Sequence, residues 1–493
     1  MNWIAANLWL IPALVLAAAQ CAVVKRQARL ISHLTPFLLV TASLLISASA
    51  AELKVGFAVT DITPPVGWRM SGYFYERPST GIHDPLQAKV IVLQQAGERA
   101  AFVLCDLIGV SREVSSAARR QASRKSGIPA EHILIAATHT HTGPLYTGSL
   151  REYFHEATAA RFGRDFHEGV DYQAILISRL ADAIVRASRS VQSARLEAGK
   201  ALAPGISFNR RYHMKDGAVR FNPGKTNAEI VRPAGPVDPE VSALVFRDRK
   251  RSSPLGALIS FPLHPDTVGG TEYGADYPFY IERTMKSALG KEFFAAFGNG
   301  TCGDINHINV NDPRPQKGHL EAQQIGTRLA GIVLSALPKL NPVTPSLAVR
   351  STTFRFPLQQ FTPAQIADAR AKMPLVGGKQ LPFLKQVEVA KITDVQLRGG
   401  RDYPLEVQVF RLGADTAVVG LPGEIFVELG LAIKKASPFR NTMVIELCND
   451  CIGYVPTQKA FSEGSYETVN SRLQPGVGEA LLESAVRLLK QLK

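Results

Sequence analysis

The residues most able to do chemistry in this sequence are two histidines that follow an apolar run. His139 and His141 lie in the run THTHTGP at positions 138–144, directly after Ile133–Ala137. Side chains of an extended chain repeat every two residues, so these imidazoles point the same way. Two imidazoles on one side suit a metal ion, or one metal ligand beside one proton carrier. A pair of surface histidines would give the same local pattern, but the Gly-Pro pair that follows indicates a loop at a strand end.

Three further polar residues occupy the same kind of position, just beyond an apolar run. They are His264 after Leu255–Leu263, Glu424 after Thr416–Leu421 and Tyr454 after Val444–Leu447. Sites in α/β proteins assemble at the carboxyl ends of strands, so we expect these side chains to converge. Each also has a structural explanation when taken alone; an acid after Pro-Gly, for example, is favoured at a helix N-terminus.

The segments that must position these residues alternate between strand and helix patterns. Strands are predicted at Ala88–Leu93, Ala100–Asp106, His132–Thr138, Leu255–Pro262, Phe293–Gly298, Val407–Leu412 and Thr416–Leu421. Helices are predicted at Tyr172–Ser190, Leu320–Ala336, Pro363–Lys372 and Glu479–Leu492, with a small excursion from the domain at Gln359–Arg401. Several strands are continuously apolar, which is typical of strands covered on both faces. The pattern predicts an α/β fold of layered mixed sheets flanked by helices.

The overall charge of the chain is strongly basic. The net charge is +14, and 46% of the residues are hydrophobic, as in an ordinary globular protein. A basic surface attracts anionic lipids or nucleic acid. No basic run is interleaved with aromatic residues, so the sequence argues against nucleic-acid binding and leaves a membrane surface as a partner.

The N-terminus has the composition of an export leader. The first apolar stretch, Trp3–Val24, is long enough to span a membrane. Basic residues and a second apolar stretch, Pro36–Ile46, then lead to Ala48-Ser49-Ala50, the pattern of a cleaved signal peptide. Translation beginning at Val23 or Val24 would explain the surplus first stretch, and a real membrane span is the rival explanation. Both predict a leader at residues 1–50 and an exported protein, periplasmic, secreted or membrane-anchored.

The cysteines are too few for a disulfide scaffold. The chain has five, and Cys448 and Cys451 form its single C-x-x-C pair. One such pair cannot build a four-cysteine zinc site. The sequence leaves two alternatives open for this pair: a local disulfide in an oxidising compartment, or two free thiols.

Taken in order, these segments resemble the catalytic domain of the neutral ceramidases, a family of zinc amidases. The resemblance runs from about Val55 to the C-terminus. It rests on GFAVTDITP (56–64), AFVLCD (101–106), THTHTGP (138–144), Asn209-Arg210, His264-Pro265, Gly303-Asp304, Pro422-Gly423-Glu424 and Tyr454-Val455. Tyr454 and Tyr466 lie twelve residues apart with Glu467 next, as two active-site tyrosines do in the family.

The resemblance implies a zinc ion bound by His139, His264, Glu424 and Tyr454. Two neutral nitrogens and two oxygens suit zinc and leave a position open for water. A phenol is an unusual ligand, since its pKa is about 10 when it is free. A nearby cation favours its ionised form.

The resemblance also implies three catalytic residues. His141 would take a proton from the attacking water and hand it to the leaving nitrogen. Tyr466 and Arg210 would hydrogen-bond the carbonyl oxygen as it becomes negative, although Arg211 next door leaves the choice of arginine open. The expected substrate is a small molecule or a lipid, with an N-acyl lipid such as ceramide first.

Two departures from the family pattern keep other interpretations open. Asn306 stands where the family has a serine, so an active protein would rely on the water route. The family's C-terminal immunoglobulin-like domain has no counterpart after the catalytic motifs, so a single catalytic domain is predicted over residues 51–493. Alternatives are another amide or ester substrate, a two-metal phosphoesterase suggested by GDINH (303–307), or an inactive binding or scaffold protein.

Overall fold

Two β-sheets form the centre of the computed structural model, which describes residues 52–493. The larger sheet is nine-stranded, in the order β14-β12-β11-β6-β1-β3-β4-β5, with β16 paired to β6. Its strands are β1 Lys54–Asp61, β3 Gln87–Gln95, β4 Glu98–Cys105, β5 Ile133–Ala137, β6 Gln192–Leu202, β11 Glu240–Asp248, β12 Pro254–Phe261, β14 Phe294–Asn299 and β16 Asn341–Val343. The smaller sheet comprises β17 Pro345–Pro357, β18 Asp402–Gly413, β19 Thr416–Gly420 and β21 Asn441–Ile445.

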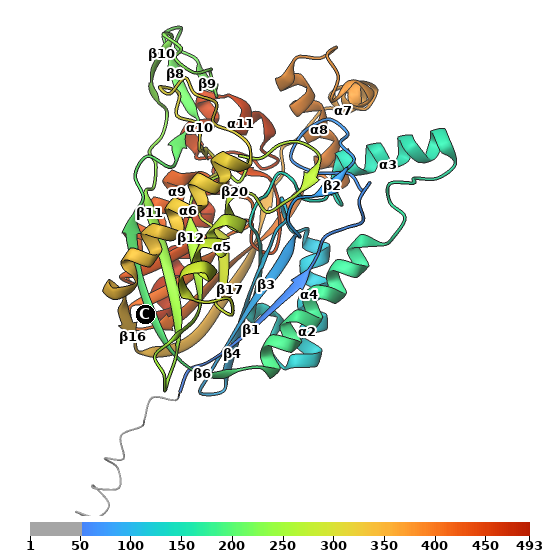
Figure 1. The fold of residues 1–493 in the computed structure, drawn as a ribbon. Coiled ribbons are helices and arrows are strands. Elements are labelled where there is room, and N and C mark those ends of the chain that lie inside the picture. Colours follow the sequence, from blue (N-terminus) through green and yellow to red (C-terminus); the bar gives the residue numbers. More distant parts are fainter. Residues whose placement is uncertain (1–51) are drawn as a thin grey trace, which may run out of the picture. The chain divides into compact units, whose positions relative to one another are not determined.

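The sheets pack face to face, and helices cover their outer faces (Figure 1). Phe102 and Leu134 of the larger sheet meet Phe410 and Ile445 of the smaller sheet in one apolar cluster. The outer helices are α2 Arg112–Ser126, α4 Tyr172–Arg189, α5 Tyr277–Leu289 and α6 His319–Ala336 on the larger sheet, and α9 Val427–Ala436 and α12 Val477–Leu492 on the smaller. This four-layer arrangement confirms the predicted α/β class, and it explains why the strands are apolar on both faces.

The accumulated twist of the larger sheet brings its two ends together. Seven strand steps separate β5 from β14, and at about 20–25° per step they rotate one strand by about 140–175° against the other. Two strands that run in opposite senses within the sheet therefore run in nearly the same direction in space. Asn299, at the end of β14, donates its Nδ2 hydrogen to the carbonyl of Thr138 after β5 at 3.4 Å. The loops after β5, β12 and β14 consequently meet at one place.

The predicted excursion at Gln359–Arg401 is a helical insertion between β17 and β18. It contains α7 (Pro363–Lys372) and α8 (Phe383–Leu397). The amide of Leu358 donates to the carbonyl of Arg401 at 2.8 Å, so the chain leaves and rejoins the sheet at the same point. Thr362 caps α7 by accepting a hydrogen bond from the amide of Gln365.

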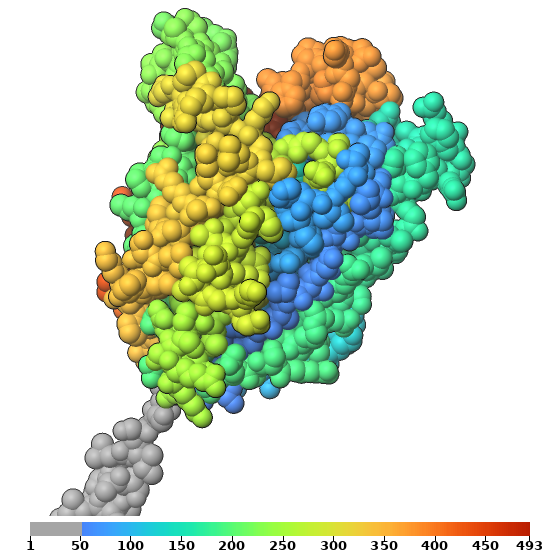
Figure 2. Space-filling view, in the orientation of Figure 1, coloured from blue at the N-terminus to red at the C-terminus, as the bar shows by residue number. Residues whose placement is uncertain are grey.

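The insertion, drawn in orange, packs on the segment near Phe74 (Figures 1 and 2). Phe74 and Phe383 meet edge to face, with ring centroids 5.8 Å apart. On its other side α8 contacts α3 (Ser149–Phe162), where the hydroxyl of Ser149 donates to the carbonyl of Ala390 at 3.0 Å. The insertion is therefore anchored to the larger sheet's side of the molecule.

The predicted leader, residues 1–50, lies outside the described residues. Within residues 52–493, the helices are all too short or too polar to cross a membrane.

Candidate active site

His139 and His264 are each fixed by a hydrogen bond from Nδ1 to a backbone carbonyl. Nδ1 of His139 donates to the carbonyl of Ile108 at 2.6 Å, and Nδ1 of His264 donates to that of Cys302 at 2.8 Å. A carbonyl oxygen can only accept, so the proton of each neutral ring must lie on Nδ1. Burial lowers the pKa of His264 to about 3, which keeps that ring neutral. The Nε2 lone pairs are therefore free for another partner.

These two lone pairs and a carboxylate oxygen face one another with no hydrogen between them. The Nε2 atoms of His139 and His264 are 3.1 Å apart, and each is 3.4 Å from Oε2 of Glu424. Oε2 of Glu424 is buried and accepts no hydrogen bond from any described residue. Three buried acceptors without a donor cost several kcal/mol. A cation at their centre would satisfy all three, so these residues fit a divalent metal ion.

Backbone geometry at the strand ends produces this convergence. His139 adopts φ 75°, which turns the chain sharply after β5. For a residue with a Cβ, that conformation costs about 1–3 kcal/mol unless the surroundings impose it. Gly303 lies against Glu424 so closely that a Cβ on it would sit 2.5 Å from the Glu424 carbonyl oxygen. The loop after β14 and the loop after β19 can approach this closely only because residue 303 is glycine.

Tyr454 lies beside Glu424 because their short strands pair in parallel. β20 (Glu424–Ile425) and β22 (Tyr454–Val455) align Glu424 directly with Tyr454. The Tyr454 ring lies parallel to that of His264, with centroids 6.5 Å apart. Burial raises the pKa of Tyr454 well above its ordinary value, so its phenol is protonated without a cation nearby. The four predicted ligands are thus brought together in one place.

His141 lies at the edge of this group. One of its nitrogens falls with those of His139 and His264 in a cluster whose ligand atoms are within 4.8 Å of one another. Its Nδ1 is 3.4 Å from Oδ1 of Asp266, and neither ring nitrogen makes a hydrogen bond to a described residue. Burial lowers the pKa of His141 to about 4, so the ring is neutral and can accept a proton. Sequence reasoning missed Asp266, although it lies two residues after His264.

The structure distinguishes Arg210 from Arg211. Arg210 donates through Nη2 to the hydroxyl of Tyr454 at 3.0 Å and through Nε to Glu467 at 2.9 Å. Arg211 shares Glu467 with it, at 3.3 Å from Nη1, but its other bonds go to Glu463 and to the carbonyl of Gly464. Of the two arginines, only Arg210 contacts one of the predicted ligands.

Tyr466 completes the group from the start of α11 (Tyr466–Asn470). Its ring lies 5.4 Å from that of Tyr454, and its hydroxyl accepts a hydrogen bond from Nδ2 of Asn470 at 3.2 Å. Burial raises the pKa of Tyr466 to about 12, so the phenol remains a hydrogen-bond donor at neutral pH.

The side chains of the segment GDINH (303–307) make hydrogen bonds to neighbouring loops. Oδ1 of Asp304 accepts from the amide of Val427, and Nδ2 of Asn306 donates to Asn222 at 3.0 Å. Nε2 of His307 donates to the carbonyl of Gln316 at 2.8 Å. The side chains of Asp304 and Asn306 are occupied by these bonds, and Nδ1 of His307 is buried without a hydrogen-bond partner among the described residues. The clusters with metal-site spacing among those residues do not include this segment.

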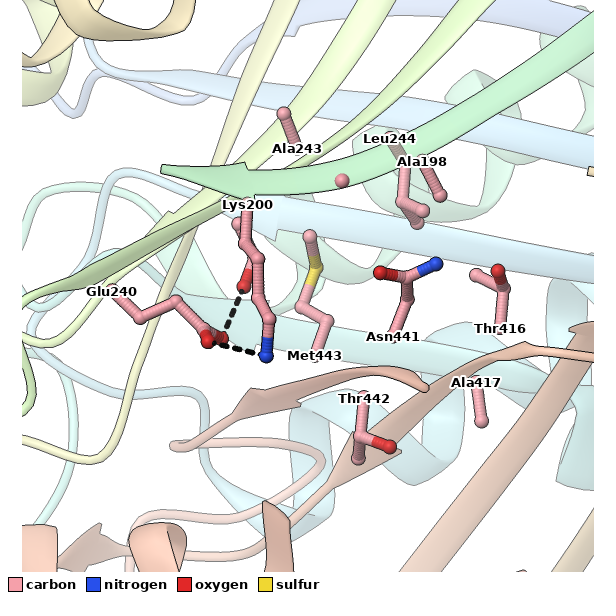
Figure 3. Close-up of a pocket in the computed structure, with 12 residues that line it drawn as sticks. Ala198, Lys200, Glu240, Ala243, Leu244, Thr416, Ala417, Asn441, Thr442 and Met443 are labelled. Carbon is pink, nitrogen blue, oxygen red and sulfur yellow. Dashed lines mark hydrogen bonds and ion pairs between the residues drawn. The ribbon is translucent and has the colours of Figure 1, made fainter. Parts of the chain in front are cut away.

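A pocket of about 600 Å³ opens onto the candidate ligands. His139, His141, Glu424, Tyr454 and Tyr466 line one end of it. The other wall, which sequence reasoning missed, is charged and is formed by Arg112, Glu113, Glu152, Asp394, Arg398, Tyr403, Asp450 and Arg472. Figure 3 shows a different cavity, beside the Lys200–Glu240 ion pair, whose volume is about 10 Å³. That cavity holds one water molecule at most, so it is not a substrate site.

Cys448 and Cys451, whose disulfide the sequence left open, are both free, as are the other described cysteines. Cys448 is buried with its Sγ directed to the carbonyl of Ile445 at 3.3 Å. Cys451 packs instead on Gly109, at the pocket wall. The two thiols thus have different surroundings.

Comparison with known proteins identifies the same family that the sequence motifs resemble. The family model described as neutral/alkaline non-lysosomal ceramidase, N-terminal, matches residues 53–324. Neutral ceramidase of Pseudomonas aeruginosa is 24% identical over 489 residues, covering 84% of this chain and 68% of that protein. Neutral ceramidase A of Dictyostelium discoideum is 26% identical over 275 residues, covering 52% of this chain and 36% of that protein.

Solved structures share the fold. The crystal structure of neutral ceramidase from Pseudomonas aeruginosa superposes with a TM-score of 0.68 at 21% identity, covering 90% of this chain and 74% of that one. A structure titled ceramidase complexed with C2 gives 0.66 at 19% identity, with 90% and 75% coverage. Because the family model matches more than half of the sequence, this chain belongs to the neutral/alkaline non-lysosomal ceramidase family.

Proposed function

We propose that this protein is a zinc-dependent hydrolase that uses an activated water to cleave an amide bond, in an N-acyl lipid such as ceramide or in a related N-acyl amine. The observation that carries the proposal is the set of three facing lone pairs on His139, His264 and Glu424, within 3.1–3.4 Å of one another. The names of the relatives, which are neutral ceramidases, support the amide substrate class.

His139, His264, Glu424 and Tyr454 would hold the zinc ion. Two imidazole nitrogens, a carboxylate and a phenol are ligands that zinc accepts, and a fourth or fifth position stays open. When bound there, zinc would supply a Lewis acid that lowers the pKa of a water molecule to about 7. The carbonyls of Ile108 and Cys302 hold the two imidazoles in the required tautomer.

His141 would accept the proton of the attacking water and deliver it to the leaving nitrogen. Burial lowers its pKa to about 4, so the ring is neutral at pH 7 and ready to accept. The Asp266 carboxylate, 3.4 Å from Nδ1, would stabilise the charged ring after the transfer. A neutral leaving amine requires this proton, since an amide anion is a poor leaving group.

Arg210 and Tyr466 would stabilise the carbonyl oxygen of the substrate as it becomes negative. Arg210 is held at the cluster by Glu467 and by the carbonyl of Gly303 at 2.7 Å, so it needs little reorganisation during the reaction. Tyr466 keeps its proton, because burial raises its pKa to about 12. Asn306 would take no part, because its amide is bonded to Asn222 and to the amide of Ile308.

The protein would act outside the cytoplasm. The support is the leader-like composition of residues 1–50, with its apolar stretches and the Ala48-Ser49-Ala50 pattern. Mass spectrometry of the mature N-terminus tests this. A mature chain that begins at Ala51 supports export, whereas a purified protein that retains residues 1–50 contradicts cleavage.

Metal analysis combined with a substrate panel tests the proposed activity. Purified protein should contain about one zinc ion per chain and should release fatty acid from a fluorogenic N-acyl substrate. A chelator should abolish the activity, and added zinc should restore it. Cleavage of esters but not amides would move the protein to another hydrolase class. Bound zinc with no turnover of ceramide, N-acyl amines or esters would favour the inactive binding protein.

A further inference from the structure

The charged wall of the active-site pocket begins next to the candidate catalytic residues. Nδ2 of Asn470 donates to the hydroxyl of Tyr466 at 3.2 Å, and Oδ1 of Asn470 accepts from Nη1 of Arg472 at 3.0 Å. Arg472 also lies against Gly453, where a Cβ would be 2.5 Å from Nη1. Since Gly453 precedes Tyr454, this guanidinium stands one residue from a candidate ligand.

Beyond Arg472 the wall carries two further arginines, Arg112 and Arg398, together with the acids Glu113, Glu152, Asp394 and Asp450. Nε of Arg472 and Nε of Arg398 both donate to Oδ2 of Asp394, each at 3.0 Å. These two guanidiniums hold the pKa of Asp394 far below its ordinary value, although burial opposes the charge, so it remains ionised. One carboxylate therefore serves two arginines. Asp450, the next acid on the wall, is engaged by the hydroxyl of Tyr403 at 2.8 Å.

Two guanidiniums on this wall keep donors free for a ligand. No described residue accepts a hydrogen bond from Nη2 of Arg472, whose side chain keeps 19% of its surface exposed. Arg112 makes one long bond, 3.4 Å from Nη1 to the carbonyl of Pro404, and has no ion pair with a described residue. Arg112 is also the first residue of α2, a 15-residue helix whose positive end favours an anion, while Glu113 beside it is exposed.

An alkyl chain is a poor occupant for such a wall. Hydrocarbon against Arg112, Arg472 and Asp394 would remove water from charged groups without replacing its hydrogen bonds. A carboxylate accepts two parallel N–H bonds from one guanidinium, which matches the free donors. The apolar side chains of the pocket, including Phe74, Ile108, Leu145 and Leu150, can still receive one acyl chain.

From this geometry we propose that the substrate is an N-acyl amine whose amine portion carries a carboxylate, such as an N-acyl amino acid. Arg472 and Arg112 bind that carboxylate, and the single acyl chain occupies the apolar part of the pocket. This inference rests on the proposed amide hydrolysis, and it specifies the substrate class for the same site.

A matched pair of substrates tests the inference. N-lauroylglycine and N-lauroylethanolamine share the acyl chain and the amide and differ in the carboxylate. The unmodified, metal-loaded protein should cleave N-lauroylglycine with a kcat/KM about 10–100-fold higher, the effect of one charge-assisted hydrogen bond. Arg472→Gln and, independently, Arg112→Gln should remove most of that preference. Arg120→Gln, an exposed arginine on the same helix as Arg112, should leave it unchanged.

Binding measurements separate this inference from the proposed activity. Calorimetry with N-lauroylglycine and N-lauroylethanolamine should show tighter binding of the acid, lost in Arg112→Gln, which makes few bonds and should fold normally. If the protein cleaves both substrates equally, or prefers the neutral amide or ceramide, the carboxylate site is refuted while amide hydrolysis stands. Tight binding of the acid without cleavage would support the site and refute the activity. If the acid is neither bound nor cleaved, both the carboxylate site and the proposed activity are refuted.

Discussion

Among the residues that the structure describes, two side-chain clusters have the spacing of a metal site, and they differ in whether an arginine pairs with their carboxylates. His139, His141 and His264 form the first, and His155, Asp165 and Glu168 form the second, with ligand atoms within 4.8 Å in each. In the second cluster Nη1 of Arg69 lies 2.6 Å from Asp165, and Arg151 pairs with Glu168. No lysine or arginine among residues 52–493 forms an ion pair with Glu424 in the first.

The difference shows that ligand spacing alone does not define a metal site. In the second cluster, guanidinium N–H groups already supply the hydrogens and the positive charge that the carboxylates need. In the first, His139 and His264 each donate their only N–H to a backbone carbonyl, so only an added cation can satisfy their remaining lone pairs. The count of protons and charges around a cluster is therefore more informative than the distances within it.

Removing one histidine from each cluster tests most directly whether only the first cluster binds a metal ion. His264→Ala should eliminate nearly all bound zinc and nearly all hydrolysis, because it deletes a ligand held by the Cys302 carbonyl. His155→Ala should keep the zinc content and the activity of the unmodified protein. Elemental analysis of both variants measures this. Metal loss in His155→Ala, or metal retention in His264→Ala, would reverse the assignment.

His141 tests the division of roles inside the first cluster. His141→Ala should keep the metal but slow turnover by about 10²–10⁴-fold, the usual contribution of a general acid–base residue. Its Nδ1 faces Asp266 at 3.4 Å, as expected for a proton carrier with an orienting carboxylate. Metal content and kcat, measured on the same preparation, check this. If His141→Ala loses as much zinc as His264→Ala, His141 is a ligand.

The ion pairs of the second cluster should contribute to the free energy of unfolding. Arg69 is fully buried and contacts Glu76, Asp165 and Thr158. Arg69→Met should lower the free energy of unfolding by about 3–5 kcal/mol, because the buried Asp165 carboxylate loses its guanidinium partner. Urea unfolding measures the loss, with Arg120→Met as the exposed control. A loss no larger than the control's would contradict the structural role.

The loss of stability in the same variant should also depend on pH. Burial raises the pKa of Asp165, but the bond from Arg69 outweighs it, and the net pKa lies below its ordinary value. A carboxyl with a lowered folded-state pKa stabilises the fold fully above about pH 4 and loses that contribution as pH falls further. The stability difference between the unmodified protein and Arg69→Met should therefore shrink below pH 4. Unfolding curves at pH 7 and pH 3 check it; a constant difference would contradict it.

The smallest effect is expected at Asn306. Its amide is bonded on both sides, to Asn222 and to the amide of Ile308, and it does not line the pocket. Asn306→Ala should retain activity within about tenfold, or about 1.4 kcal/mol of barrier. Asn306→Ser should form no acyl-enzyme. Kinetics with intact-mass analysis of quenched reactions tests both, and a trapped acyl adduct would require a nucleophile other than water.

The convergence of these candidate ligands was predictable because strand ends are visible in the sequence. His139, His264 and Glu424 each follow an apolar run, and the strands ending before them are β5, β12 and β19. Buried strands give strong local sequence signals, and the position of a residue directly after such a strand is restricted by the end of that strand. The resemblance to a known family then placed Tyr454 and Tyr466, whose local patterns are weak.

Other features depend on contacts between distant segments and left no local signal. Asp394 and Arg472 meet across 78 residues of sequence, so no spacing rule connects them. Helix α2 was not predicted, because REVSSAARRQASRKS has few apolar residues. The state of the C-x-x-C pair could not be predicted, because a sequence motif does not show whether two thiols point to different neighbours.

The insertion between β17 and β18 has a consequence for how this enzyme scaffold can change. A hydrogen bond from the amide of Leu358 to the carbonyl of Arg401 joins its two ends. The pairing of β17 with β18 therefore continues up to the point where the insertion leaves the sheet. The insertion supplies Asp394 and Arg398 to the pocket, but none of the candidate ligands. The candidate ligands and these two pocket residues thus lie in separate stretches of chain. Changes within residues 359–400 can therefore alter the support that Asp394 gives to Arg472, and with it the proposed carboxylate site, without replacing a candidate ligand.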